Sequence, residues 1–358
     1  MNIIKTLSAL LRQNNMDAVL ITDNVALAYV TGMSNIEGTV FITKDEKAFC
    51  FTDSRYIEAA QNIVPPRGFA VSTVEGNNYF KHISQMCKDL GVKALGFEDA
   101  YMTVQQYKRA EAVFDHLQLV DASGILQELR THKSDFEVNS IKRAQKIAEE
   151  ALDILLGEIK PGDTEKACKA RLEYLMSVKG SEMPSFDTIF ITGKKTSMPH
   201  GVSGDNIIEK GDFITIDFGA TINGYKSDMT RTVAVGGVSD EMKKVYDTVL
   251  CAQLAAIEKA VVGTPLKDVD SAARDIIKNA GYGQYFGHGT GHGVGLEIHE
   301  APTVSPRSSV NAANGQVITI EPGIYIPETF GVRIEDMLYF VDDNRVNLTN
   351  YPKNLIIL

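Results

Sequence analysis

Two stretches of sequence decide the fold of this chain: GDFITIDFG at residues 211–219 and GQVITIEPG at residues 315–323. In each stretch a glycine opens a short apolar run, and an acid, Asp217 or Glu321, ends that run just before a second glycine. A short apolar run bounded by glycines indicates a buried strand. Because the same pattern returns after 104 residues, it predicts two similar halves related by duplication.

The segments around these two strands repeat as well. Two helical patterns precede each stretch, and a second strand pattern follows it. Ser134 and Glu137 have the spacing of a capping box at the start of the first long helix. We therefore predict two helix–helix–strand–strand halves that face each other. The helices are expected at about 134–156, 164–179, 240–261 and 266–280, and the strands at 213–219, 225–235, 317–320 and 332–340.

The N-terminal third of the chain has a different organisation, with shorter helical and strand-like patterns in alternation. Apolar runs at residues 18–22, 39–42 and 92–97 predict strands. The whole chain is thus expected to be α/β (α+β), with a small α/β domain at residues 1–125 and the duplicated domain at residues 126–358.

Composition and charge limit the kind of partner. The chain has 358 residues, of which 44% are hydrophobic, and a formal net charge of −10. This is the composition of an ordinary globular protein, and its acidity argues against general binding of nucleic acid or of an anionic membrane. Four cysteines stand far apart, and no apolar run approaches the ~18 residues of a membrane span. We therefore expect a cytoplasmic protein with reduced cysteines.

The first candidate site residues lie on a predicted hairpin. The Asn-Gly pair at residues 223–224 is a strong signal for a two-residue turn. That turn would place Asp217 opposite Thr230, and Asp228 opposite Gly219. Both aspartates would then share one face of the hairpin as diagonal neighbours, ~7–8 Å apart. Two carboxylates so close repel each other unless a cation lies between them.

The second half offers matching acids and a histidine-rich loop. Glu321 takes the position of the first aspartate, and Glu335 lies on the following strand, as the second aspartate does. Residues 287–295 read GHGTGHGVG and are followed by His299. If the halves face each other, four carboxylates meet, and a dinuclear metal site resolves their repulsion. Oxygen ligands with one imidazole suit Mn²⁺, Co²⁺, Fe²⁺ or Zn²⁺.

Taken together, these residues resemble the M24, or pita-bread, metallopeptidases. That family includes Xaa-Pro dipeptidase (prolidase), aminopeptidase P and methionine aminopeptidase. The resemblance covers the chain from about residue 127 to the end, and residues 1–125 are similar to a creatinase-type N-domain. It rests on the motifs PHG at 199–201, DFG at 217–219, SDMTRT at 227–232, HGTGHG at 288–293, IHE at 298–300, EPG at 321–323 and RIED at 333–336, with YVTG at 29–32 and DSRY at 53–56 in the N-domain.

The resemblance implies a set of site residues, carried over motif by motif. Those expected to bind metal are Asp217, Asp228, His292, Glu321 and Glu335, with Asp228 and Glu335 bridging two ions. Those expected to act in catalysis are His200, His299 and Glu321. Those expected to contact the substrate are His288 and Arg333.

The activity implied is hydrolysis of the Xaa-Pro bond at the N-terminus of peptides or dipeptides, by attack of a hydroxide that bridges two divalent metal ions. Manganese is the expected metal, with cobalt, zinc or iron as alternatives. A methionine or broad-specificity aminopeptidase of the same fold stays open, and a catalytically inactive binding module is a further alternative. The resemblance also suggests a homodimer. Dipeptidase and aminopeptidase are not separated by the sequence.

Overall fold

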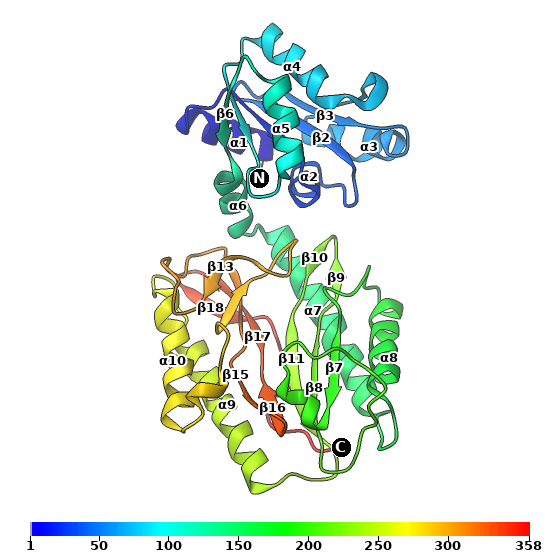
Figure 1. Ribbon diagram of the computed structural model, residues 1–358, viewed down its shortest axis with the longest axis vertical. Helices are drawn as coiled ribbons and strands as arrows, with labels where there is room; N and C mark the ends of the chain where they lie inside the picture. Colours follow the sequence, from blue (N-terminus) through cyan, green and yellow to red (C-terminus); the bar gives the residue numbers. More distant parts are fainter. Residues whose placement is uncertain (1) are drawn as a thin grey trace. The chain divides into compact units, whose positions relative to one another are not determined.

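The computed structural model describes residues 2–358 and divides into two compact units, Met1–Arg130 and Thr131–Leu358 (Figure 1). The limit between them falls within helix α6 (Ser123–Thr131), a few residues beyond the boundary expected at residue 125. Each unit has hydrophobic clusters of its own. Among the described residues, no helix is long and apolar enough to cross a membrane.

Unit 1 is built on a six-stranded sheet with the order β4-β3-β2-β1-β5-β6. The central strand β1 is buried on both faces, because Val19 and Ile21 pack into one cluster and Ala18 and Leu20 into the other. This double burial explains why the strand reads as a continuous apolar run. The strands are β1 (Ala18–Ile21), β2 (Gly38–Thr43), β3 (Ala48–Thr52), β4 (Ala70–Thr73), β5 (Ala94–Phe97) and β6 (Gln118–Asp121), and the helices before α6 are α1 (Ile3–Gln13), α2 (Asn24–Thr31), α3 (Ile57–Ile63), α4 (Tyr79–Leu90) and α5 (Val104–Val113).

The first half of unit 2 has two helices and a three-stranded sheet with the order β11-β8-β7. Helix α8 packs against β7, and α7 packs against the short hairpin β9–β10. Glu137 accepts hydrogen bonds from the backbone N and Oγ of Ser134 (2.7 and 2.5 Å), so the predicted capping box is confirmed. The elements are α7 (Asp135–Leu156), α8 (Glu165–Val178), β7 (Ile189–Thr192), β8 (Phe213–Phe218), β9 (Thr221–Ile222), β10 (Tyr225–Lys226) and β11 (Met229–Ala234).

The second half repeats this order with more strands. Its main sheet has the order β13-β12-β14-β17-β18, and β15 and β16 form a separate hairpin. Helix α9 packs against β14, β15 and β16, and α10 packs against α9 and β13. The elements are α9 (Asp240–Lys259), α10 (Leu266–Asn279), β12 (Gly291–Gly293), β13 (Glu300–Val304), β14 (Val317–Ile320), β15 (Gly323–Ile326), β16 (Phe330–Arg333), β17 (Asp336–Val341) and β18 (Asn344–Asn347).

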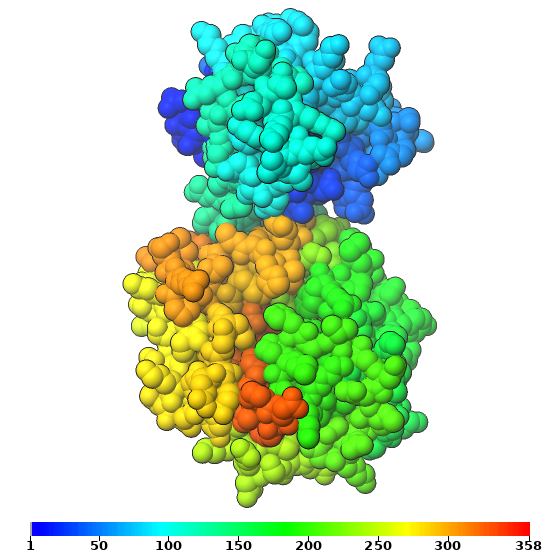
Figure 2. All heavy atoms as spheres, in the orientation of Figure 1, coloured from blue at the N-terminus to red at the C-terminus, as the bar shows by residue number. Residues whose placement is uncertain are grey.

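The two halves of unit 2 place their strands between two pairs of helices. In Figure 1 the pair α7 and α8 (green) lies on one side of the strands and the pair α9 and α10 (yellow) on the other. Figure 2 shows the C-terminal strand region (red) at the surface between the green first half and the yellow second half. The predicted α/β fold with a duplicated helix–helix–strand–strand domain is confirmed.

The predicted hairpin register is also confirmed. Asp217 pairs with Thr230 across β8 and β11, and Tyr225 pairs with Ile222 across β9 and β10. The turn residue Asn223 has φ 53° and the glycine after it has φ 77°. Positive φ at both central positions is the signature of a type I′ turn, whose twist matches that of the flanking strands.

The two strands predicted at residues 225–235 and 332–340 are wrong in one respect, because each is broken in the middle. The first breaks at residues 227–228, where the hydroxyl of Ser227 accepts a hydrogen bond from the backbone N of Ala220 (3.0 Å) and so disturbs the regular ladder. The second breaks at residues 334–335. There the backbone N of Glu335 donates across to the carbonyl oxygen of Thr230 in the first half (3.1 Å). Each break therefore carries one acid of the candidate site.

Candidate active site

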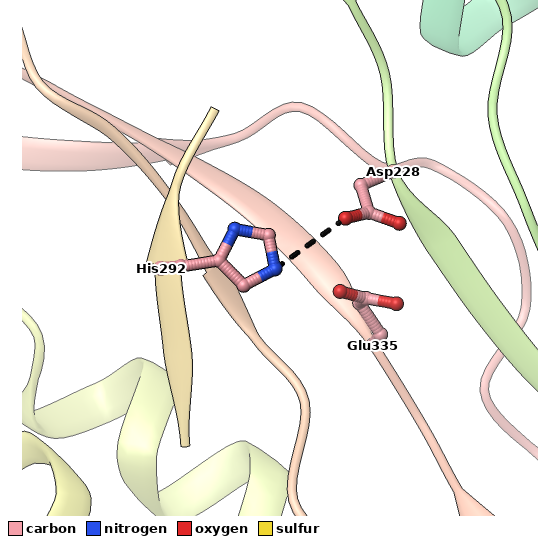
Figure 3. Close-up of side chains that lie close together, drawn as sticks. All are labelled: Asp228, His292 and Glu335. Carbon is pink, nitrogen blue, oxygen red and sulfur yellow. Dashed lines mark ion pairs between the residues drawn. The ribbon is translucent and has the colours of Figure 1, made fainter. Parts of the chain in front are cut away.

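Three candidate ligands converge in the middle of unit 2. One ligand atom from each of Asp228, His292 and Glu335 lies within 4.8 Å of the other two, an arrangement that could hold a metal ion (Figure 3). Both carboxylates are buried. Nε2 of His292 lies 3.6 Å from Oδ2 of Asp228. The two acids come from the two strand breaks, and the histidine comes from β12.

The other two predicted ligands border this group. Oε1 of Glu321 lies 3.2 Å from Nε2 of His292. Oδ2 of Asp217 accepts a hydrogen bond from Nη2 of Arg333 (2.6 Å). Oδ1 of Asp217 is buried and has no hydrogen-bond partner among the described residues. A buried carboxylate oxygen with no donor is costly unless something positive approaches it.

The pKa values of the acids in the cluster are shifted as expected for buried carboxylates that lie close together without a metal ion. Burial and the charge of Glu335 raise the pKa of Asp228 well above its usual value, and burial with the charges of Glu321 and Asp217 does the same for Glu335. Burial opposes ionisation of Glu321 too, but the hydrogen bond and charge of His292 outweigh it and lower the pKa of Glu321 to about 2. The cluster thus takes up protons to relieve repulsion that divalent cations would remove.

The orientation of His292 suits a metal ligand. Its Nδ1 lies 3.1 Å from the carbonyl oxygen of Gly293, which can only accept a hydrogen bond. Nδ1 therefore carries a proton, and Nε2 is left to face Asp228 and Glu321. A backbone carbonyl that fixes the tautomer in this way is typical of ligating histidines.

A chain of hydrogen bonds runs beside the acids. His288 Nδ1 lies 2.8 Å from the carbonyl oxygen of Gly289, so its Nε2 accepts the hydrogen bond from the hydroxyl of Tyr325 (2.9 Å). That hydroxyl in turn accepts a hydrogen bond from Nη1 of Arg333 (2.9 Å). The other terminal nitrogen of the same guanidinium, Nη2, donates to Asp217. Tyr325 was not among the residues predicted from the sequence. It lies four residues after Glu321 on an apolar strand, where a tyrosine reads as ordinary packing.

The remaining two predicted histidines lie at the exposed side of the cluster. The ring of His299 is 4.3 Å from that of His292, centroid to centroid, in an edge-on arrangement. Burial and the charge of His292 lower the pKa of His299. His200 is exposed on the loop before β8, and the carbonyl oxygen of its neighbour Pro199 accepts a hydrogen bond from Arg333 (3.4 Å). The structure thus places every predicted site residue in or next to one region of unit 2.

Glycines allow the ligand strands to approach their neighbours closely. A Cβ atom added at Gly219 would overlap the carbonyl oxygen of Ser227, next to Asp228. A Cβ atom added at Gly291 would overlap the carbonyl oxygen of Thr319. Gly219, two residues after Asp217, and Gly291, just before His292, are therefore required by backbone packing.

The donor set fits a pair of divalent cations. It consists of carboxylate oxygens and one imidazole nitrogen, and these are ligands that Mn²⁺, Fe²⁺, Co²⁺ and Zn²⁺ bind. The orphaned Oδ1 of Asp217 and the proton-binding pair Asp228 and Glu335 are positions where a cation would replace an unpaired or protonated oxygen. Arrangements of this kind serve metal-assisted hydrolysis.

Known proteins are similar to this chain in sequence and in structure. Residues 139–342 match Metallopeptidase family M24, and residues 3–132 match the Creatinase/Prolidase N-terminal domain. The chain is 37% identical over 359 residues to the Xaa-Pro dipeptidase of Pyrococcus horikoshii, covering 99% of this chain and 98% of that protein. The structure of the Xaa-Pro dipeptidase from Bacillus anthracis is similar with a TM-score of 0.94 and 38% identity, covering 99% of both chains. That of the X-Pro aminopeptidase from Thermotoga maritima has a TM-score of 0.90 and 34% identity, covering 98% of this chain and 100% of that one.

With a family match over more than half of its length, relatives that align from end to end and a cluster able to hold metal, the chain belongs to metallopeptidase family M24 and is a metallopeptidase that uses divalent metal ions.

Proposed function

We propose that this metallopeptidase hydrolyses the bond between the first residue and a proline in Xaa-Pro dipeptides or at the N-terminus of longer peptides. The observation that carries the proposal is the intact cluster around Asp228, His292 and Glu335 in a chain that aligns over its whole length with proteins named Xaa-Pro dipeptidase. Xaa-Pro aminopeptidase is the second candidate, supported by the similarity to the Thermotoga maritima structure.

We assign five residues to the metal ions in this proposal. Asp228 and Glu335 are buried opposite each other, which suits bridging carboxylates. Asp217 would complete the site of one ion, and His292 with Glu321 that of the other. When bound, the two cations would supply Lewis acidity for the scissile carbonyl and lower the pKa of the attacking water. We propose manganese as the native metal, with cobalt, zinc or iron as alternatives.

The chain's own groups would handle the protons. Glu321 is held as a carboxylate by its contact with His292, so its oxygen can accept a proton from the attacking water. The lowered pKa of His299 keeps its imidazole neutral at pH 7, with one N–H to donate to the developing oxyanion. His200 and His288 are proposed to contact the substrate, His200 from an exposed loop and His288 from a ring fixed by Tyr325.

Arg333 takes a different role in this proposal from the one expected from the sequence. Arg333 is 3% exposed, and its guanidinium is already hydrogen-bonded to Asp217, Tyr325 and a backbone carbonyl. A group so committed is poorly placed to bind a substrate carboxylate. We therefore propose that Arg333 positions Asp217.

The test is a cleavage assay read by mass spectrometry, with Mn²⁺ and with a chelator control. Turnover of Ala-Pro alone would identify a dipeptidase, whereas chelator-sensitive turnover of Ala-Pro-Ala-Ala would identify an aminopeptidase. Cleavage of Met-Ala-Ala would show a broader or methionine-directed specificity. If none of the three peptides is cleaved although Mn²⁺ binds, the proposal is wrong.

We also propose that the protein is a homodimer of the cytoplasm. The four cysteines form no disulfide, which agrees with a reducing compartment. The dimer rests on the family resemblance, and light scattering coupled to gel filtration would test it, since the chain mass is 39.2 kDa.

A further inference from the structure

One buried carboxylate that is not itself a candidate ligand contacts the backbone next to two of the candidate metal ligands. Asp270 on α10 is 1% exposed, and its Oδ1 accepts hydrogen bonds from the backbone N (3.1 Å) and the hydroxyl (2.8 Å) of Thr290. Thr290 lies two residues before His292, and its carbonyl oxygen accepts a hydrogen bond from the backbone N of Glu321 (2.8 Å). Asp270 therefore holds the residue that joins the His292 segment to the Glu321 segment.

Arg274, one turn after Asp270 on the same helix, bonds both to Asp270 and to the backbone of the same segment. It forms two hydrogen bonds with Asp270, from Nε to Oδ2 and from Nη2 to Oδ1, both at 2.8 Å. Its outer nitrogens donate to the carbonyl oxygens of His288 (2.8 Å) and Phe286 (3.1 Å). The guanidinium carbon also lies 4.2 Å from the ring centroid of Phe286. The pair thus grips residues 286–290 from one side.

The segment that is gripped alternates glycine with Phe286, His288 and Thr290, so only these three residues have side chains that can fix it. Residues 287, 289, 291 and 293 are all glycines, which have no side chain to pack and lose the most conformational freedom on folding. A buried ion pair is weak evidence of a stabilising role, because desolvation offsets much of its attraction. Its fixed, forked geometry does, however, define where the bonded backbone lies.

We propose that the Asp270–Arg274 pair is a positioning device for the metal centre, which aims His292 and Glu321 at the metal ions by fixing the backbone of residues 286–290. The inference rests on the proposed metal-binding role of those two ligands. Its main readout, metal affinity, is measured without turnover.

The first half contains a comparable acid that provides a matched comparison. Glu165 on α8 is 0% exposed, pairs with Nζ of Lys195 (2.7 Å), and accepts hydrogen bonds from the backbone N of Thr192 (3.0 Å) and Gly204 (2.7 Å). It holds the segment that carries His200, which contains no proposed ligand. Loss of Glu165 should therefore disturb a loop without loosening a metal ligand.

The experiment titrates Mn²⁺ into the metal-stripped full-length chain by calorimetry at 25 °C. Asp270→Asn and Arg274→Met are expected to raise the Kd for Mn²⁺ about 10- to 100-fold, the usual effect of losing a partner that orients a ligand. Arg274→Lys, which keeps the charge but not the fork, should give a smaller increase. Glu165→Gln and the core variant Ile277→Val, on the helix of Asp270, should bind Mn²⁺ within about twofold of the unchanged chain, because among the described residues no hydrogen bond or ion pair joins either side chain to residues 286–290.

Thermal unfolding and kinetics complete the design. If Asp270→Asn and Arg274→Met lower the melting temperature as Ile277→Val does but bind Mn²⁺ normally, the pair is only structural and the inference is overturned. If Asp270→Asn does not fold, Thr290→Val removes one hydrogen bond to the same carboxylate and must raise the Kd in the same direction. If the unchanged chain binds Mn²⁺ but cleaves neither Ala-Pro nor Ala-Pro-Ala-Ala, the proposed function fails, while the affinities still decide this inference.

Discussion

The acids of the candidate site differ in their burial and in their hydrogen-bond partners. Asp228 and Glu335 are buried against each other and take up protons, whereas Asp217 has a guanidinium on one oxygen and, among the described residues, no hydrogen-bond partner on the other. Single side chains therefore already show where positive charge is missing. This is why substitution of one of the two proposed bridging acids is expected to affect metal binding more than folding.

Asp228→Ala tests that expectation. Turnover of Ala-Pro should fall by at least about 100-fold, since even partners outside the ligand set commonly contribute 10- to 100-fold. Far-UV circular dichroism should be unchanged, because the substitution removes a buried acid whose ionised form its neighbours oppose. Asp247→Ala on the exposed face of α9 is the matched control. Activity of Asp228→Ala close to that of the unchanged chain would contradict the dinuclear assignment.

A buried acid in unit 1 gives a second residue-level prediction. Oε2 of Glu98 accepts hydrogen bonds from the backbone N of Thr22 and Asp23 (2.6 and 2.9 Å), while Oε1 is buried and finds no hydrogen-bond partner in the part of the chain that the structure describes. Burial outweighs those bonds and raises the pKa of Glu98 from 4.5 to about 7. The folded state then binds this proton more tightly than the unfolded state does. Its contribution to stability is complete below pH 4.5 and is lost as the pH rises to about 7, by about 3 kcal/mol in all.

Glu98→Gln should remove that loss. Urea denaturation of the full chain, followed by circular dichroism at pH 5 and pH 8, should show a smaller drop in stability for the variant than for the unchanged chain. Glu111→Gln, at an exposed position of the same unit, is the control. Equal drops in all three proteins would contradict the assignment of a raised pKa to Glu98.

Sequence patterns predicted the residues at strand ends but not the residues that support them. Asp217 and Glu321 were visible because each ends an apolar run between glycines. Tyr325 was not, because its role depends on a hydrogen bond to Arg333 across a hairpin. Tyr225 looked like packing beside a turn, yet its hydroxyl donates to Glu137 at the start of α7 (2.8 Å), a contact between residues 88 positions apart. Such pairings depend on tertiary structure, which a local pattern does not contain.

At the level of elements, the hairpin register was predictable and the strand breaks were not. The Asn-Gly turn fixes the pairing of β8 with β11, because a two-residue turn leaves one register. The breaks arise where Ser227 bonds to Ala220 and where Glu335 bonds to Thr230 of the other half. Periodicity over residues 225–235 or 332–340 gives no sign of either partner.

Gly219→Ala tests how strictly the hairpin is packed. The added Cβ would overlap the carbonyl oxygen of Ser227, so β8 and the segment before Asp228 must separate. Overpacking of this kind costs about 1–3 kcal/mol, which corresponds to a melting temperature lower by roughly 2–10 °C. The Kd for Mn²⁺ should also rise. Gly124→Ala, where the new methyl group meets open space, is the control. A variant at Gly219 with unchanged melting temperature and Mn²⁺ affinity would show that the strands adapt freely.

At the level of the whole molecule, the duplication was the strongest prediction because it used helices, strands and acids together. The helix ends agree with the structure to within about two residues. Unit 1 was predicted in outline only: α2, α3, β4, α5, β6 and α6 were not identified individually. Most of β4 and α5 is exposed, so these elements lack a strong hydrophobic pattern.

Metal removal should change the stability of the whole chain and its dependence on pH. The raised pKa values of Asp228, Glu335 and His292 mean that these groups hold extra protons in the metal-free folded state, so the stability that they contribute is lost as the pH rises through their raised pKa values. Mn²⁺ at a fixed concentration of 100 times its Kd at pH 8 should add about 2.7 kcal/mol at that pH, or roughly 5–10 °C in melting temperature. The increase should be smaller at pH 5, where protons compete with the metal for the same acids. Differential scanning calorimetry with and without chelator measures both, and an increase that is absent at pH 8 would contradict the metal site.

The equivalence of the two strand breaks has a consequence for how such a site could have originated. A precursor that corresponds to one half of unit 2 would carry only two of the four acids. Such a precursor would bring four acids together only as a symmetric pair of chains, with identical acids on both sides. Joining two such copies in one chain would remove that symmetry. The first half contributes two aspartates and the second half two glutamates. The acidic side chains of the second half are therefore longer by one methylene group. Two ions in such a centre need not be equivalent, and each can be tuned by changes in one copy alone.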